Sequence, residues 1–346
     1  MSGYPSMEKR SLAVPRRVIL SKSRASPEMN RRQFSDYTVF GLRVRSTFLL
    51  PELFRARGPG EPDVWIEEQE EDGLVSAEAG LTQIEGGLLL RVPEIGQFAI
   101  TNGDRVRVQA KPGAARSNVR LFLLGSALGA LLHQRKMLPL HGNAVEIEGR
   151  AFVFLGPSGA GKSTLAAWFH DQGHRILADD VSVVDTNQKG EAVVQPGLPR
   201  LRLWQDALVA SGRTSEGLQR SYIGTAEKFE KFDVPLDSSS MVHSAMKLGG
   251  IYVLRKGDEV AFSRLSGIAS AEALFAHTYR GSYVIAAGSQ QSHWQSVMHL
   301  AARTPVFGAT RPMDQRKFNR DAATLLAHAR LLASGGASSS NMPAGH

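Results

Sequence analysis

The sequence predicts an α/β fold, in which strands and helices surround a phosphate-binding loop and a β-rich part precedes them. Three observations lead to this prediction. Residues 156–164 form a glycine-rich run, G-P-S-G-A-G-K-S-T, directly after an apolar strand-like run and directly before a helix-like run. Residues 37–110 alternate apolar and polar side chains in short runs. Residues 121–132 form an apolar stretch that is too short to cross a bilayer and is typical of a buried helix.

The composition fits a globular protein. The chain has 346 residues, enough for one large domain or two, and its 42% hydrophobic and 21% charged residues are ordinary for soluble proteins. It contains no cysteine, which excludes disulfides and thiolate zinc sites and is compatible with the reducing cytoplasm, where we expect it to act. No apolar run has the length of a membrane span, so we expect no membrane anchor.

The net charge of +8 arises mainly in an N-terminal arm. Residues 1–32 carry eight Lys and Arg side chains against two Glu, among scattered Pro and Ser residues. This composition predicts a solvated, disordered arm without the apolar core of a signal peptide. Contact of the arm with an acidic partner stays open, although we expect no nucleic-acid partner. The predicted division of the chain is a basic arm (1–35), a β-rich N-terminal domain (36–115), a catalytic domain (116–333) and a flexible tail (334–346).

The elements follow in order along the chain. A buried helix is predicted over about 117–136, with Ser117 as its N-cap, and a strand follows over 138–147. The glycine-rich run lies between a strand over 152–155 and a helix that ends near Gly173. The remaining predicted elements are strands over 37–48, 87–92, 97–100, 174–178, 181–184 and 192–195, two strands within 247–262, and helices over 270–278, 289–302 and 314–333.

The glycine-rich run has the chemistry of a nucleotide site. Its glycines allow successive backbone N–H groups to face phosphate oxygens, and the helix N-terminus adds partial positive charge. Lys162 is placed to contact the β- and γ-phosphates, and Ser163 offers a hard oxygen ligand for Mg²⁺. The alternative is a glycine-rich turn that binds nothing. The residues predicted to bind ATP are Gly156, Pro157, Ser158, Gly159, Ala160, Gly161, Lys162, Ser163 and Thr164.

Two further features carry titratable groups. Asp179 and Asp180 end the strand that follows the glycine-rich run, where one carboxylate can bind Mg²⁺ and its neighbour can act as a base. The alternative is an Asp-Asp pair that only begins a turn. His141 begins the strand before the glycine-rich run and titrates near neutrality, although a histidine taken alone is more often structural.

Together these runs resemble a known family. The segments L-H-G-N-A-V-E-I-E-G-R, F-L-G-P-S-G-A-G-K-S-T and Q-G-H-R-I-L-A-D-D-V resemble the catalytic domain of bacterial HPr kinase/phosphorylase in order and spacing. The resemblance is good over about 138–185, weaker to about 330 and absent before 115. It implies a P-loop kinase core of the HPr kinase and phosphoenolpyruvate carboxykinase type, which uses ATP and Mg²⁺ and forms a homo-oligomer.

The resemblance also implies roles for single residues. His141 corresponds to the catalytic histidine of the family, and Lys162 corresponds to its phosphate-contacting lysine. Ser163 corresponds to the Mg²⁺ ligand, with Asp179 as a neighbour in the metal shell. Asp180 corresponds to the carboxylate that accepts the proton of the substrate serine.

Two departures from the family pattern narrow the expected substrate. The glutamate-bearing signature of the family has no obvious equivalent within 196–204, and its arginine loop is replaced by a lysine-containing stretch over 227–235. The chain resembles most the divergent HPr-kinase-like proteins, among them kinases that phosphorylate the terminal serine of a lasso-peptide precursor. The resemblance therefore implies a serine kinase acting on a peptide or small protein, and the candidate residues for holding the peptide are Arg200, Arg202, Lys228 and Lys231.

Three alternatives remain open at this stage. The first is an HPr(Ser) kinase/phosphorylase proper, which also catalyses the reverse reaction. The second is a nucleotide-binding regulatory module without phosphoryl transfer, although a pure switch has no need of the base that the pair Asp179 and Asp180 supplies beside the metal. The third is a small-molecule kinase that acts on free serine or on a nucleoside.

Overall fold

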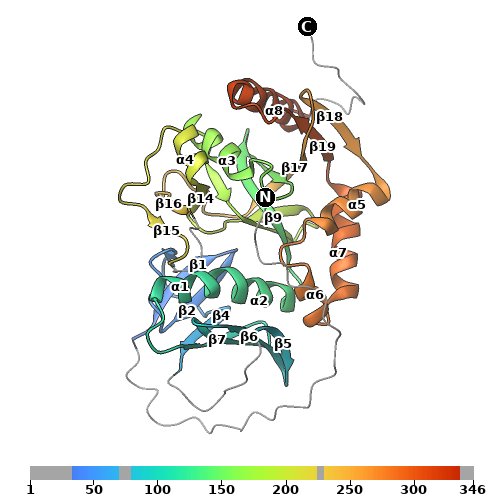
Figure 1. Cartoon of the computed structure of the whole chain (residues 1–346). Helices are drawn as coiled ribbons and strands as arrows, with labels where there is room; N and C mark the ends of the chain where they lie inside the picture. The colour runs from blue at the N-terminus through green and yellow to red at the C-terminus, as the bar shows by residue number, and fades with distance from the viewer. Residues whose placement is uncertain (1–32, 70–78, 224–229, 336–346) are drawn as a thin grey trace.

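The computed structural model describes residues 33–69, 79–223 and 230–335. Most of the predicted arm (1–35) and of the predicted tail (334–346), together with Lys228, lies outside the described residues. Within the described residues, the strands form two eight-stranded sheets and a smaller three-stranded sheet. The fold is mixed α/β, as predicted, with a helical segment lying between the two large sheets (Figure 1).

The N-terminal sheet is built from the predicted β-rich region. Its strand order is β3-β1-β2-β4-β8-β7-β6-β5. The single strand predicted over 37–48 is instead a hairpin, because Phe40 and Gly41 both take positive φ angles, of 54° and 75°, and reverse the chain between β1 and β2. The strands are β1 (Ser35–Val39), β2 (Leu42–Ser46), β3 (Phe54–Arg55), β4 (Val64–Glu68), β5 (Gly80–Ile84), β6 (Gly87–Val92), β7 (Gly96–Thr101) and β8 (Arg105–Ala110).

The predicted buried helix is present and contacts both large sheets. It consists of α1 (Arg116–Phe122), a π-helical segment (Leu123–Ala127) and α2 (Leu128–Gln134). Its apolar residues share one core cluster with the N-terminal sheet and with Val181 and Val183 of the second sheet. A helix that is apolar on most sides is stable only when it is buried on most sides. The two sheets are therefore joined by a common core.

The second sheet carries the predicted glycine-rich run. Its strand order is β10-β9-β12-β13-β17-β19-β18, with β11 paired to β9. Because β10 also pairs with β17, five of these strands form a closed circuit of pairings. The strands are β9 (Leu138–Ile147), β10 (Arg150–Leu155), β11 (Ile176–Ala178), β12 (Val181–Thr186), β13 (Ala192–Gln195), β17 (Met246–Lys256), β18 (Ala261–Leu265) and β19 (Val306–Arg311).

Helices and a small sheet cover this second sheet. α5, α6 and α7 lie along one side of the molecule, and α8 packs against β17 at the end away from the N-terminal sheet (Figure 1). The small sheet, α4, α6 and β19 are absent from the sequence prediction. The elements are β14 (Arg200–Trp204), β15 (Gln219–Arg220), β16 (Lys231–Pro235), α3 (Lys162–Asp171), α4 (Gln205–Ala210), α5 (Gly267–Ala276), α6 (Ser282–Ala286), α7 (Gln290–Arg303), a 3₁₀ turn (Gln315–Lys317) and α8 (Phe318–Ala333).

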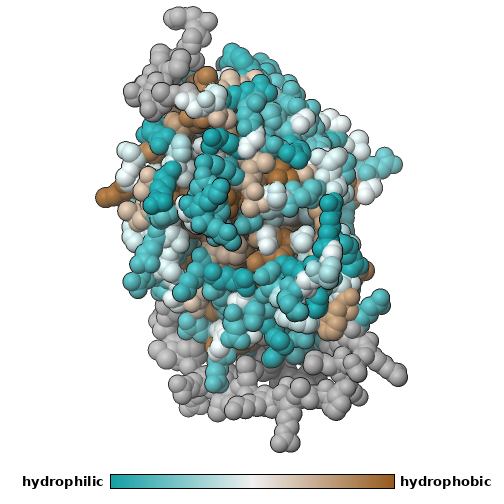
Figure 2. Space-filling view, turned by 180° about the vertical axis from the view of Figure 1, so that it is seen from behind, coloured by the Kyte–Doolittle hydropathy of each residue, from teal (hydrophilic) through white to brown (hydrophobic). Residues whose placement is uncertain are grey.

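The surface is mainly polar. On the face shown in Figure 2, apolar residues lie in small groups near the middle and hydrophilic residues cover most of the rest. In the described part of the chain, none of the helices is both long and apolar enough to span a bilayer.

Candidate active site

The register of strand β9 brings the three sequence motifs together. His141 lies opposite Val181 of β12, which directly follows the aspartate pair. Gly142 lies opposite Leu155 of β10, which directly precedes the glycine-rich loop. A Cβ atom at Gly142 would overlap the carbonyl oxygen of Phe154, so the close approach of β9 and β10 requires glycine there. β9 lies between β10 and β12, and its two neighbouring residues His141 and Gly142 bring the ends of these strands, and so the motifs, together.

The glycine-rich loop (Gly156–Thr164) has the backbone that the sequence predicts. Gly159 and Gly161 take φ angles of 81° and 77°, in the left-handed region that favours glycine. Lys162 lies over the loop, where its Nζ donates hydrogen bonds to the carbonyl oxygens of Gly156 at 2.8 Å and Pro157 at 3.1 Å. Both bonds go to backbone carbonyls rather than to a carboxylate, so this ammonium can turn to an incoming phosphate without breaking an ion pair.

Ser163 and Asp179 place two hard oxygens side by side. The Ser163 hydroxyl donates to Asp179 Oδ1 at 3.1 Å, and Asp179 Oδ2 accepts from the backbone N–H of Arg202 at 2.7 Å. Burial raises the pKa of Asp179. Within the described residues, no cluster of three or more acidic or histidine side chains is arranged to hold a metal by itself. The pair fits Mg²⁺ when phosphate oxygens of a nucleotide complete the shell.

Asp180 is held in an unusual conformation between two cations. Its φ of 75° lies in the left-handed region, which Asp and Asn tolerate better than most residues. Its carboxylate lies 3.1 Å from Arg202 Nη1 and 4.0 Å from Lys231 Nζ. Burial opposes ionisation of Asp180, but Arg202 and Lys231 outweigh burial and hold its pKa well below the usual range. The side chain is therefore an anion at neutral pH.

A cluster of cations surrounds Asp180. Arg200 and Arg202 of β14 both contact Asp233 of β16, at 2.7 Å and 3.1 Å. Lys231 begins the same strand β16. Asp180 and Asp233 contact these cations directly, and Asp179 and Glu52 act on them from further away. Arg202 Nη2 is buried without a hydrogen-bond partner in the described part of the chain. The cluster, defined as Arg200, Arg202 and Lys231, therefore retains one unused N–H donor group for an anion next to Asp180.

His141 is neutral and stacked. Burial is the main cause that lowers its pKa to about 4, so the imidazole carries no charge at neutral pH. Its ring stacks on that of Tyr279, with centroids 6.1 Å apart and planes 12° apart. The segment after α5 runs beside the start of β9, because the His141 N–H donates to the His277 carbonyl at 2.7 Å and the Tyr279 N–H donates to that of Pro139 at 2.9 Å.

Tyr279 is a site residue that sequence reasoning missed. It is buried, and its carbonyl oxygen lies 2.8 Å from His133 Nε2 of helix α2. A Cβ at Gly129, on the same helix, would lie only 3.0 Å from the Tyr279 ring, so glycine makes room for it. The one available signal was the polar and aromatic run H-T-Y-R at the predicted helix end, at residues 277–280.

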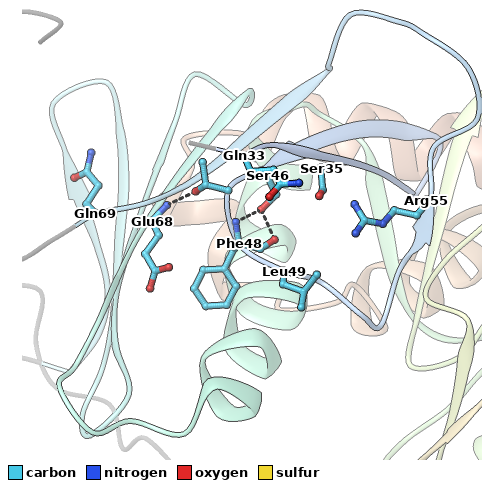
Figure 3. Close-up of a pocket in the computed structure, with 9 residues that line it drawn as sticks. Gln33, Ser35, Ser46, Phe48, Leu49, Arg55, Glu68 and Gln69 are labelled. Atoms are coloured by element: carbon cyan, nitrogen blue, oxygen red, sulfur yellow. Dashed lines mark hydrogen bonds between the residues drawn. The ribbon is translucent and has the colours of Figure 1, made fainter. Parts of the chain in front are cut away.

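The structure also has a cavity of about 730 Å³ in the N-terminal sheet (Figure 3). Its charged lining residues, Arg55 and Glu68, lie on opposite sides and each has another contact. Arg55 lies over the ring of Tyr37 at 4.6 Å, and Glu68 is paired with Arg116. Ser46 and Phe48 bond to each other locally. We therefore place the candidate active site at the glycine-rich loop.

The structure thus brings His141, Lys162, Ser163, Asp179 and Asp180 into one site, and their roles stay predictions. Of the residues expected to hold a peptide, Arg200, Arg202 and Lys231 gather beside Asp180, whereas Lys228 lies outside the described residues. Lys162 is buried, with 9% exposure, although lysine is seldom buried in folded proteins.

Comparison with known proteins was made by sequence and by structure. No protein-family model matches the chain. The chain is 30% identical over 121 residues to the HPr kinase/phosphorylase of Lactobacillus gasseri and 36% identical over 122 residues to that of Lactobacillus johnsonii. It is 43% identical over 54 residues to that of Prosthecochloris aestuarii. These matches cover 32%, 32% and 16% of this chain, and 37%, 37% and 15% of the relatives.

Among solved structures, the HPr(Ser) kinase/phosphatase from Coxiella burnetii aligns with a TM-score of 0.30 and 15% identity, over 57% of this chain and 99% of that chain. The chain spans little more than a third, or less, of the length of its curated relatives. The sequence matches confirm the predicted resemblance to the HPr kinase/phosphorylases, at low identity and over part of the chain.

Proposed function

We propose that this chain, a relative of the HPr kinase/phosphorylases, is an ATP- and Mg²⁺-dependent kinase that phosphorylates a serine hydroxyl on a peptide or small protein. One observation carries the proposal. A loop lysine, two adjacent carboxylates and a partly buried neutral histidine converge at one point of the sheet, as positioning and charge stabilisation of a transferring phosphoryl group require.

In this proposal, the glycine-rich loop forms the side of the site that binds the nucleotide. Its N–H groups and Lys162 would hold the phosphates of ATP, and Ser163 and Asp179 would hold Mg²⁺. The ion supplies charge neutralisation of the phosphate oxygens when it is bound. His141, being neutral, retains one N–H that can donate a hydrogen bond to the transferring group.

Asp180 is the base in this proposal. A bond forms between the serine oxygen and the γ-phosphorus while the bond from phosphorus to the β,γ-bridging oxygen breaks, and the serine proton passes to the Asp180 carboxylate. Its low pKa makes it a weak base. A weak base is sufficient because phosphoryl transfer passes through a loose transition state, in which the attacking oxygen needs little activation.

The cluster of Arg200, Arg202 and Lys231 supports an acceptor with an anion close to its hydroxyl. Arg202 contacts the proposed base, and its Nη2 has no hydrogen-bond partner among the described residues. A serine at the end of a peptide carries a carboxylate two bonds from the carbon that bears its hydroxyl. The C-terminal serine of a lasso-peptide precursor belongs to this class, and acidic side chains beside an internal serine offer the same charge.

Transfer from γ-labelled ATP to four acceptors tests the proposal. The acceptors are a serine-ended peptide, the same peptide with a C-terminal amide, free serine and HPr. We expect label on the peptide, with kcat/KM about ten- to a hundredfold lower for the amide, because one charge-assisted hydrogen bond is lost. Efficient labelling of HPr with phosphate-driven reversal would instead identify an HPr kinase/phosphorylase proper. Preferred labelling of free serine would identify a small-molecule kinase, and ATP binding without transfer to any acceptor would identify a regulatory module.

A further inference from the structure

A residue far along the chain contacts the glycine-rich loop. Strand β19 pairs in parallel with β17, which pairs in parallel with β10, the strand that leads into the loop. Arg311 is the last residue of β19. Its Nη2 donates a hydrogen bond of 2.8 Å to the carbonyl oxygen of Ala160, inside the loop. A Cβ at Gly161 would overlap this guanidinium, so the third glycine of the run leaves room for Arg311.

The guanidinium is buried without a close counterion. Arg311 is only 4% exposed and lies over the ring of Phe318 at 5.3 Å. Its Nε is buried without a hydrogen-bond partner in the described part of the chain. Asp321 of α8 attracts it from a distance, but the ion-pair contact of Asp321 is with Arg320, at 3.5 Å. A buried cation without a close partner is costly to the fold, and a bound anion nearby offsets this cost.

The contact also fixes the orientation of a loop peptide. The peptide between Ala160 and Gly161 is planar and trans, so its N–H points opposite to its carbonyl. Because Arg311 holds the carbonyl oxygen, the Gly161 N–H is directed away from Arg311. A donor on the carbonyl also polarises the peptide and strengthens its N–H as a donor.

We propose that Arg311 is a positioning residue for the nucleotide phosphates. It fixes the Gly161 N–H toward the phosphate side of the loop and adds a buried positive charge behind it. This inference rests on the proposed ATP site. It extends that site to residues of β19, which neither the sequence motifs nor the proposed function included.

Two variants and a matched control test the inference. Arg311→Met removes the charge and the donor while keeping an unbranched apolar stem, and Arg311→Lys keeps the charge but loses the planar fork. Arg135→Met is the control. Like Arg311, Arg135 donates to a backbone carbonyl in a glycine turn, that of Gly103 at 2.9 Å, and Gly103 has a φ of 68°. This turn belongs to the N-terminal sheet. Dissociation constants for ATP, ADP and AMP, the thermal unfolding midpoint, and KM for ATP and for the acceptor are measured in each.

We expect Arg311→Met to weaken ATP binding about tenfold or more, ADP binding less and AMP binding least, because the lost charge acts on the phosphates. KM for ATP should rise while KM for the acceptor stays unchanged. Arg311→Lys should weaken ATP binding about threefold, and Arg135→Met should not affect it.

Two results overturn the inference: unchanged ATP affinity in the folded variants, or equal losses for ATP, ADP and AMP. If Arg311→Met does not fold, unchanged ATP affinity of Arg311→Lys is decisive against it. Failure of the unmodified protein to bind ATP would contradict the proposed function itself. That result is distinct from a failure of the Arg311 inference, which requires that the unmodified protein binds ATP.

Discussion

The two sides of the candidate site are built in different ways. Apart from His141 and the proposed Arg311, the nucleotide side comes from one continuous stretch, from Gly156 to Asp179, and is made largely of backbone N–H groups and a helix N-terminus. The acceptor side comes from β14, β16 and the segment after α5, and consists of long side chains that meet only in the folded chain. A ligand that many enzymes share is bound by a short local motif. A ligand specific to one enzyme is bound by side chains that differ between relatives.

The largest effect is expected where the two sides meet. Asp180→Asn keeps the shape and tolerates the left-handed backbone at this position, but it cannot accept a proton. Loss of a general base typically lowers the rate by about 10²–10⁴-fold. Turnover with the peptide should fall by this factor, while the dissociation constant for ATP, measured by calorimetry, changes little. If ATP·Mg²⁺ affinity collapses and turnover at saturation is normal, Asp180 is a metal ligand and the base lies elsewhere.

On the nucleotide side, Lys162→Ala should lower kcat about 10²–10³-fold, because a positioned charge on the transferring phosphate is lost. Lys162 is buried, but it bonds only to carbonyls of its own loop, so the fold should persist. Circular dichroism and the unfolding midpoint check the fold. A folded variant with near-normal turnover would falsify the assignment of the loop as the ATP site.

On the acceptor side, Lys231→Met should raise KM for the serine-ended peptide about tenfold and leave KM for ATP unchanged, because one charge facing the acceptor is removed. Steady-state kinetics with each substrate varied in turn measure the split. Lys111→Met is the control, because Lys111 is paired with Glu94 on the exposed N-terminal sheet. Equal rises in KM for the peptide and for ATP would show that Lys231 does not act on the acceptor alone.

The smallest effect is expected at Tyr279, whose ring stacks on that of His141. Tyr279→Phe keeps the ring that stacks on His141, whereas Tyr279→Leu removes it. An aromatic pair contributes about 0.5–1.5 kcal/mol, so kcat should fall about two- to tenfold in Tyr279→Leu and little in Tyr279→Phe. Similar losses in both variants would mean that the hydroxyl, and not the stacked ring, is what the site needs.

Sequence alone predicted the parts of the molecule that depend on local chemistry. The buried helix, the glycine-rich loop and its flanking strand and helix are present near their predicted bounds, and the family resemblance is confirmed. The loop was predictable because glycine and lysine at fixed spacing act within one turn of chain. His141 and Asp180 were singled out from their places beside predicted strands, and the resemblance supplied their expected roles. Their neighbourhood follows from strand pairing that no short pattern contains.

The missed features all depend on distant partners. Arg311 lies 151 residues from the carbonyl it contacts, and β19 gave no clear alternating pattern. The pairing of Arg202 with Asp233 requires the register of β14 and β16, which the sequence does not encode locally. The hairpin at Phe40 and Gly41 was missed although the alternation shifts there by one position, from Tyr37 and Val39 to Leu42 and Val44, and the positive φ angles account for the reversal.

The helix between the two sheets has a consequence for how this chain can be divided. The motifs that resemble the HPr kinase/phosphorylases all follow this helix, at residues 140–181, but the apolar core extends from the helix into the N-terminal sheet. Val119, Leu123 and Leu131 share one cluster with strands on both sides. A shortened chain starting at residue 116 would expose the helix face that the N-terminal sheet covers. The N-terminal sheet is therefore a structural component of the part that carries the three motifs, and the two would be lost or kept together.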